Sequence, residues 1–149
     1  MAQAISIRPV AAADRADWAR LWRGYLAFYR TELPEAVYET LFARLMAPGA
    51  DGPFGLLAEA GGRPVGLVHY LYHLHCWRPE GVVYLQDLFV DPEARGQGAA
   101  RALIEAVYAA ADAAGRPSVY WMTETHNTTA RALYDRIGAA TDFMKYVRG

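Results

Sequence analysis

Cysteine is almost missing from this sequence, since Cys76 is the only one among 149 residues. A single thiol cannot form a disulfide within the chain, which excludes the disulfide-rich scaffolds of small secreted proteins. Positive and negative charges are also nearly balanced, because the formal net charge is −1 at pH 7. We therefore expect neither the phosphate backbone of a nucleic acid nor an anionic membrane as a partner.

Long apolar runs are absent as well. No stretch approaches the roughly 18 consecutive apolar residues of a membrane-spanning helix. The first ten residues lack the apolar centre of a secretory signal peptide. Together with the scarcity of cysteine, these absences make the cytoplasm the expected location.

What is present describes an ordinary globular chain. Apolar residues make up 54% and charged residues 21% of the sequence, which is far from the composition of disordered chains. A chain of 149 residues has the size of one domain and can bury one continuous core. We therefore expect a single domain over residues 1–149.

Alternation, helical spacing and turn residues predict a mixed α/β fold. Trp18, Leu21, Trp22 and Tyr25 recur at three- and four-residue spacing, which predicts one face of a helix. The expected strands cover residues 5–9, 54–60, 65–75, 82–90, 119–122 and 143–147. The expected helices cover residues 12–30, a segment after Pro34, a segment from Gly98 to Gly115, and residues 127–138. This order favours a mixed central sheet with helices on both faces.

The segment from Tyr84 to Ala100 combines a buried strand, a tight turn and the glycine-rich start of a helix. The first amides of a helix lack partners and lie at the positive end of its dipole, so they favour an anion such as pyrophosphate. Gly96 and Gly98 let the backbone approach that anion closely, and Arg95 can add a charge-assisted contact. Glycines after a strand are more often an ordinary turn, so their spacing decides the interpretation.

Two motifs have the spacing of a known family. The pattern R-x-x-G-x-A, from Arg95 to Ala100, matches the R/Q-x-x-G-x-G/A signature of the GNAT superfamily of N-acetyltransferases. Roughly thirty residues later, the pattern N-x-x-A-x-x-L-Y-x-x-x-G, from Asn127 to Gly138, resembles the second acetyl-CoA motif of that superfamily. Taken alone, Asn127 would be a helix N-cap and Tyr134 a core aromatic. Their occurrence in the right order favours the family.

From about Ile5 to its end, the chain therefore resembles a GNAT acetyltransferase. The resemblance implies one GNAT domain with about six to seven strands, acetyl-CoA as the cofactor and a homodimeric assembly. It also implies transfer of an acetyl group to the primary amine of a small molecule, such as a polyamine or an amino acid. The cofactor-binding residues expected from it are Leu88, Phe89, Val90, Arg95, Gly96, Gln97, Gly98, Ala99, Ala100, Arg101, Asn127, Ala130 and Tyr134.

Two shorter stretches resemble particular branches of the superfamily, but they do not identify the amine that accepts the acetyl group. Residues 84–90 resemble the corresponding strand of spermidine/spermine acetyltransferases, except that Gln86 stands where those enzymes carry Glu. Residues 118–123 and 145–149 resemble a fungal branch that acetylates histones, polyamines or D-amino acids. Acetylation of a protein lysine or N-terminus, and a non-catalytic acyl-CoA sensor, stay open as alternatives.

Three side chains are expected to carry the chemistry. An amine arrives largely as ammonium, so it must lose a proton before its nitrogen can attack. Asp87 is the expected proton acceptor through ordered water, and Gln86 is expected to position substrate or solvent. The family position of the general acid falls on Tyr134, and backbone amides near Phe89 are expected to stabilise an oxyanion. Alternation places Gln86 and Asp87 on opposite faces, so we expect one of them to reach the acceptor pocket.

The histidines of one expected strand suggest a metal site at first. His69, His73 and His75 share parity, and Cys76 is adjacent. Strand neighbours two residues apart are separated by roughly 7 Å and converge poorly on one ion, so we expect no metal. Lining of an acceptor pocket is the preferred functional interpretation.

Aromatic side chains are the other candidates for that pocket. Tyr25, Tyr29 and Trp77, together with Gln86, are the expected acceptor-binding residues, because aromatic faces can hold a cationic amine. Packing in the core or in a subunit interface is the alternative for these rings.

Overall fold

A computed structural model describes residues 3–149, so Met1 and Ala2 of the predicted domain lie outside the described range. All four predicted helices and five of the six predicted strands are formed, which confirms the mixed α/β class. The elements are β1 (Ile5–Pro9), a 3-10 turn (Ala12–Asp14), α1 (Arg15–Phe28), α2 (Glu35–Met46), β2 (Phe54–Ala60), β3 (Arg63–His75), β4 (Arg78–Val90), a second 3-10 turn (Pro92–Ala94), α3 (Ala99–Ala113), β5 (Val119–Tyr120) and α4 (Thr128–Ile137).

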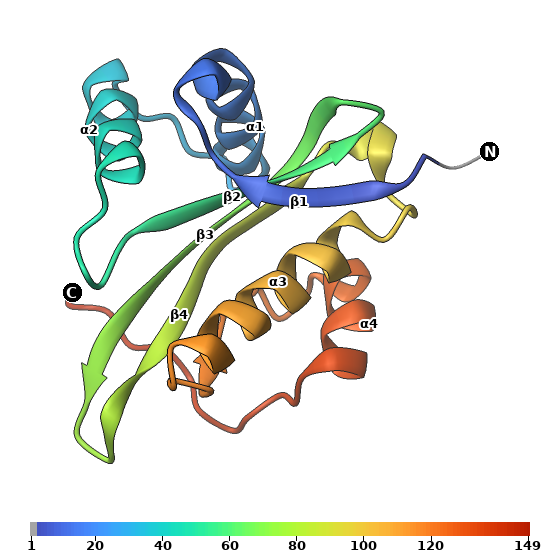
Figure 1. The fold of residues 1–149 in the computed structure, drawn as a ribbon. Helices are drawn as coiled ribbons and strands as arrows, with labels where there is room; N and C mark the ends of the chain where they lie inside the picture. Colours follow the sequence, from blue (N-terminus) through green and yellow to red (C-terminus); the bar gives the residue numbers. More distant parts are fainter. Residues whose placement is uncertain (1–2) are drawn as a thin grey trace.

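The strands form one mixed sheet in the order β1-β2-β3-β4-β5. Neighbouring strands are antiparallel, except β4 and β5, which run parallel. Helices α1 and α2 lie on one face of the sheet, and α3 and α4 lie on the other (Figure 1). Across residues 3–149, no helix has both the length and the apolarity needed to cross a membrane.

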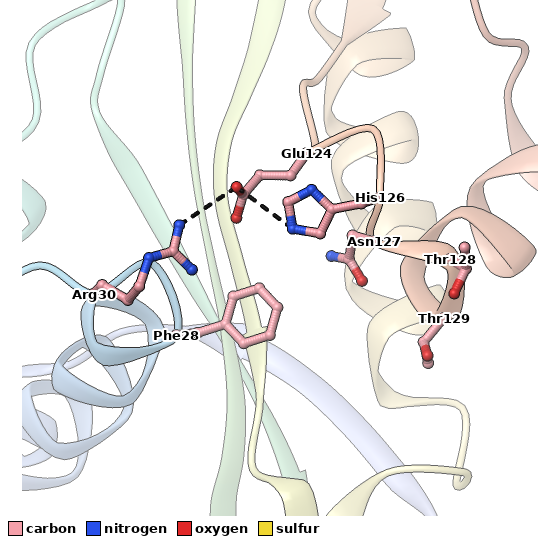
Figure 2. Close-up of a pocket in the computed structure, with 7 residues that line it drawn as sticks. All are labelled: Phe28, Arg30, Glu124, His126, Asn127, Thr128 and Thr129. Atoms are coloured by element: carbon pink, nitrogen blue, oxygen red, sulfur yellow. Dashed lines mark ion pairs between the residues drawn. The ribbon is translucent and has the colours of Figure 1, made fainter.

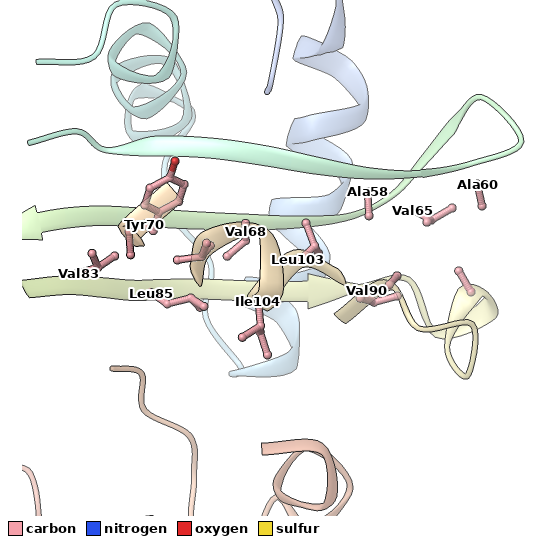
Figure 3. Packing of buried hydrophobic residues seen from close by; sticks show 14 of the residues in the cluster. Ala58, Ala60, Val65, Val68, Tyr70, Val83, Leu85, Val90, Leu103 and Ile104 are labelled. Atoms are coloured by element: carbon pink, nitrogen blue, oxygen red, sulfur yellow. The ribbon is translucent and has the colours of Figure 1, made fainter. Parts of the chain in front are cut away.

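Each face of the sheet has its own apolar core. Leu103 and Ile104 of α3 are completely buried and pack with Val68 on one face (Figure 3). On the other face, Trp18 of α1 and Leu57 of β2 are also completely buried. Burying a side chain of this size stabilises the fold by about 1.5–3 kcal/mol. These two cores hold β3 and β4 between rigid layers.

One extra residue interrupts the pairing of β3 and β4. His69 pairs with Asp87 and Tyr70 pairs with Leu85, so Gln86 has no partner of its own on β3. Such a β-bulge bends the strand and changes which way its side chains point. Here the bulge leaves Gln86 exposed, whereas Asp87 is buried.

The parallel pairing of β4 with β5 is very short. It covers only Val83 with Val119 and Tyr84 with Tyr120. From Leu85 to Val90, β4 therefore keeps β3 as a neighbour, and no other strand formed by residues 3–149 pairs with its other side. The sheet parts at this point, between the carboxyl-terminal half of β4 and the segment that leads into α4.

The predicted strand over residues 143–147 is wrong, and the described sheet has five strands instead of six to seven. Phe143 and Tyr146 are 86% and 87% exposed. Alternating apolar residues form a strand only where a neighbouring strand and a covering layer receive them, and this tail has neither within the described chain. The predicted strand over 119–122 is shortened to Val119–Tyr120.

Candidate active site

The glycine-rich turn before α3 is open to a ligand. Gly98 is the N-cap residue of α3 with a φ of 84°, and Gly96 has a φ of 81°. A Cβ at either position would meet no atom of the described chain within 4 Å. No side chain in the described part of the chain caps the first turn of α3, so its amides are available to an external acceptor. Arg95 beside them is exposed.

The free edge of β4 begins next to this turn. The Asp91 amide donates to the Val65 carbonyl oxygen at 2.8 Å, which makes these two residues a hydrogen-bonded pair of the antiparallel ladder. Because such pairs alternate, the Phe89 amide points toward β3, and the amides of Leu88 and Val90 point toward the open side. The amides near Phe89 that can serve a ligand are thus those of its two neighbours.

Tyr134 lies in a narrow pocket of about 20 Å³ where the sheet parts. Burial raises the pKa of its hydroxyl to about 12, and the neighbouring Tyr29 adds to the effect. The ring of Tyr134 packs edge-on against Trp121, with the ring centroids 5.6 Å apart. The lining residues are Tyr25, Tyr29, Leu85, Gln86, Leu88, Trp121, Met122 and Tyr134. Five predicted site residues, Tyr25, Tyr29, Gln86, Leu88 and Tyr134, therefore meet in one place.

Asn127 forms the N-cap of α4. Its Oδ1 accepts from the Ala130 amide at 3.4 Å, and its Nδ2 donates to Thr123 Oγ1 at 3.3 Å. This cap fixes the start of the helix that carries Tyr134 on its second turn.

Asp87 belongs to a buried polar cluster between the sheet and α1. Its Oδ2 lies 2.8 Å from His69 Nδ1 and accepts from Trp22 Nε1 at 3.2 Å. On the far side of the imidazole, Trp18 Nε1 donates to His69 Nε2 at 2.9 Å. Side chains of β3 and α1 thus hold Asp87 in place. His73 and His75, which the sequence analysis grouped with His69, take no part in this cluster.

Tyr25 connects this cluster to the pocket of Tyr134. Burial, followed by the charge of Asp87 and a hydrogen bond to it, raises the pKa of the Tyr25 hydroxyl. The same hydroxyl lies 3.5 Å from the carbonyl oxygen of Gln86, the bulged residue. Asp87 is therefore linked to the pocket through a tyrosine, and Gln86 lines it directly. This link could not be predicted from the sequence, because neither the bulge nor the cross-strand pair of His69 and Asp87 is a local pattern.

A second pocket has a volume of about 290 Å³ (Figure 2). It lies between the end of α1 and the start of α4, and its lining residues are Phe28, Arg30, Glu124, His126, Asn127, Thr128 and Thr129. Arg30 Nη2 is 3.6 Å and His126 Nε2 is 3.7 Å from Glu124 Oε2. Arg30 has a φ of 55°, the left-handed conformation that a non-glycine residue adopts at an energetic cost.

Trp77 does not join the other predicted acceptor residues. It lies in the turn between β3 and β4, is 82% exposed, and contacts His75 with ring centroids 5.7 Å apart. His73 binds Tyr120 instead, with 2.8 Å between Nε2 and Oη. The three histidines thus have separate partners, because His69 binds Asp87 and His75 accepts from the Trp77 amide. Within residues 3–149, no group of three or more potential ligands could hold a metal ion.

Comparisons with known proteins agree on one family. The profile of the acetyltransferase (GNAT) family matches residues 18–139. The D-amino-acid N-acetyltransferase HPA3 of Saccharomyces cerevisiae is 39% identical over 146 residues, which cover 97% of this chain and 90% of that protein. Among solved structures, aminoglycoside acetyltransferase AAC(6')-Iy with a CoA-based bisubstrate analogue has a TM-score of 0.84 at 19% identity, covering 98% of each chain. The ribosomal-protein-alanine N-acetyltransferase of Brucella melitensis has a TM-score of 0.80 at 22% identity, covering 98% of this chain and 99% of that one.

Proposed function

The chain belongs to the acetyltransferase (GNAT) family, and we propose that it transfers the acetyl group of acetyl-CoA to the amine of a small amino acid. The observation that carries this proposal is the position of Tyr134, whose protonated hydroxyl lies where β4 has lost its neighbouring strand. The whole activity is assigned to one domain over residues 1–149.

The residues before and within α3 fit a pyrophosphate. Gly96 and Gly98 leave the space that a Cβ would fill, and the uncapped amides of α3 supply donors. We assign the diphosphate to residues 95–101 and the pantetheine arm to the free edge of Leu88, Phe89 and Val90. Asn127, Ala130 and Tyr134 would hold the arm from α4.

Replacing Gly98 with valine is expected to weaken CoA binding by about tenfold or more, because a β-branched residue disfavours positive φ and its side chain fills the space left for the anion. Titration calorimetry with CoA measures the change. Gly115→Val is the matched control, since Gly115 is also left-handed, with a φ of 71°, but lies at the other end of α3. Equal CoA affinity in the Gly98 variant and the wild type would remove this turn from the cofactor site.

Two protons have to move during the transfer. Bound acetyl-CoA supplies a thioester whose carbon–sulfur bond breaks as the amine nitrogen bonds to the carbonyl carbon, so the amine loses a proton and the sulfur gains one. Asp87 accepts the amine proton through Tyr25 or through water, since the narrow pocket has room for about one water molecule. Tyr134 donates to the sulfur, and the amides of Leu88 and Val90 are free to donate to the carbonyl oxygen.

The second pocket supports an amino acid as the acceptor. Phe28 and Arg30 flank Tyr29, and Glu124 follows Met122 by two residues, so the same two segments line both pockets. A guanidinium there can bind a carboxylate in two-pronged geometry while the amine of the same molecule reaches the first pocket. The relative from Saccharomyces cerevisiae is named for acetylating D-amino acids, which points to the same class of acceptor.

Thiol release in a screen of D- and L-amino acids, polyamines, aminoglycosides and lysine peptides tests the proposed function. We expect turnover with amino acids, and we expect Arg30→Ala to raise their KM about tenfold by removing a charge-assisted contact. Amino-acid methyl esters are the matched substrates, because they lack the carboxylate and should be insensitive to the change. Turnover restricted to polyamines or peptides would assign a different acceptor. Absence of thiol release with any amine would favour an acyl-CoA sensor.

We also propose a cytoplasmic homodimer. The apolar tail supports the dimer, because Phe143, Met144, Tyr146 and Val147 are all at least 74% exposed. Monomers seldom expose a contiguous apolar segment of this kind. The mass of the full chain in solution distinguishes a dimer from a monomer.

A further inference from the structure

The hydrogen bonds of His69 determine where its proton lies. An indole N–H can only donate, so the 2.9 Å contact from Trp18 Nε1 means that His69 Nε2 accepts and carries no proton. A neutral imidazole then has its proton on Nδ1, which lies 2.8 Å from Asp87 Oδ2 and donates to it. Trp18, His69 and Asp87 are 0%, 3% and 9% exposed.

This arrangement leaves no acceptor for a second proton on His69 Nε2. A second proton on Nε2 would face the N–H of Trp18, and the buried ring could not turn to water instead. Among the described residues, no buried side-chain polar atom lacks a hydrogen-bond partner. The cluster is therefore complete as it stands, with a neutral imidazole between an indole and a carboxylate.

The other elements packed around the imidazole bring no competing charge. Trp22 of α1 lies with its ring centroid 5.9 Å away, and Tyr38 of α2 packs on the rings of Trp18 and Trp22. From β2, the partner residue of His69 is Gly55. The guanidinium of Arg15 stacks on Trp18 at 5.4 Å, and the hydroxyl of Tyr25 approaches Asp87. Asp87 is the charged group that touches the ring.

We propose that His69 is a positioning residue for acetyl transfer, locked by Trp18 in its neutral Nδ1–H form. In that form it orients the carboxylate of Asp87 toward Tyr25 and takes up no proton itself. The proposal rests on the proposed function through the role of Asp87. It extends that function by giving the residues of the cluster different roles. Asp87 moves a proton, and His69 and Trp18 hold Asp87 in position.

Nitrogen NMR of ¹⁵N-histidine-labelled protein tests the lock without any turnover. At neutral pH we expect His69 to show the signature of the neutral Nδ1–H tautomer. Trp18→Phe keeps an aromatic ring but removes the N–H. In that variant Nε2 loses its donor, so we expect His69 to show a mixture of the two neutral tautomers and kcat to fall. A wild-type signal from the Nε2–H form or the imidazolium at neutral pH, or a Trp18→Phe variant with an unchanged tautomer, would overturn the lock.

A pair of substitutions at His69 separates positioning from proton transfer. Glutamine offers an amide N–H for Asp87 and a carbonyl oxygen for Trp18, whereas leucine offers neither. We expect His69→Leu to lower kcat about tenfold to a hundredfold with unchanged CoA affinity, and His69→Gln to restore most of the loss. Equal losses in both variants would show that the imidazole itself carries the proton and would overturn the proposal.

Failure of the proposed function has a different signature. If the wild type shows the locked tautomer but releases no thiol with any amine, acetyl transfer is wrong, and the role of His69 in it falls as well. If the wild type turns over amines and the tautomer is not locked, only the inference about His69 is overturned.

Discussion

Tyr134→Phe should lower kcat by about a hundredfold while leaving CoA affinity within about twofold of the wild type. The reason is that phenylalanine keeps the packing against Trp121 and loses only the hydroxyl. Burial holds the pKa of that hydroxyl at about 12, so Tyr134 is protonated at every pH at which the enzyme would be assayed. Steady-state thiol release gives kcat, and calorimetry gives the affinity for CoA.

Tyr108→Phe is the matched control for this prediction. Tyr108 is a half-buried tyrosine of α3 whose hydroxyl donates to the Ile137 carbonyl oxygen at 2.7 Å, at the carboxyl-terminal end of α4. Its loss should change stability without changing the chemistry. If Tyr134→Phe and Tyr108→Phe have the same kcat, the general acid is a different group.

The second large effect is expected for Asp87→Asn, which should lower kcat/KM by about a hundredfold at neutral pH. Asparagine has nearly the same shape as aspartate, and its carbonyl oxygen can still accept from Trp22 or His69, but it is a far weaker base. The variant then depends on amine that is already deprotonated in solution. Its rate should rise about tenfold per pH unit until the pH reaches the pKa of the acceptor amine, and the wild-type rate should rise less steeply.

The pH profile distinguishes a lost base from a damaged fold. Asp91→Asn is a suitable control, because Asp91 lies four residues further on and accepts from Arg20 Nη1 at 2.7 Å, outside the buried cluster. It should keep the wild-type profile. A loss of activity in Asp87→Asn that is equally large at all pH values would indicate a structural role for Asp87 and would remove it as the base.

Sequence reasoning succeeded where the pattern is local. The turn at Gly96 and Gly98 and the cap at Asn127 are set by residues a few positions apart, and both were predicted at the right place. The helix that carries Tyr134 follows from the same short-range rules. Because the second motif fixed the start of that helix, the position of Tyr134 at the parting of the sheet could be anticipated.

It failed where pairing between distant segments decides the outcome. One unpaired residue, Gln86, shifts the register of β4. Cross-strand partners also separate the histidines, because His69 binds Asp87 and His73 binds Tyr120. Trp77 was grouped with Tyr25 and Tyr29 by residue type alone, but the hairpin carries it away from them. Strand formation at 143–147 also needs a partner strand, which no pattern within five residues can supply.

The two segments that border the parting of the sheet, β4 and the segment leading into α4, are held in place by different numbers of hydrogen bonds. The β4 wall is fixed by a long ladder to β3, whereas the wall that leads into α4 is joined to β4 at only two residue pairs. Opening the second wall breaks fewer hydrogen bonds, so its free energy of local opening is the smaller of the two. Local opening of the segment that leads into α4 would therefore let the CoA thiol leave. Asp87 and the residues that bind it, His69 and Trp22, would keep their positions on the other side.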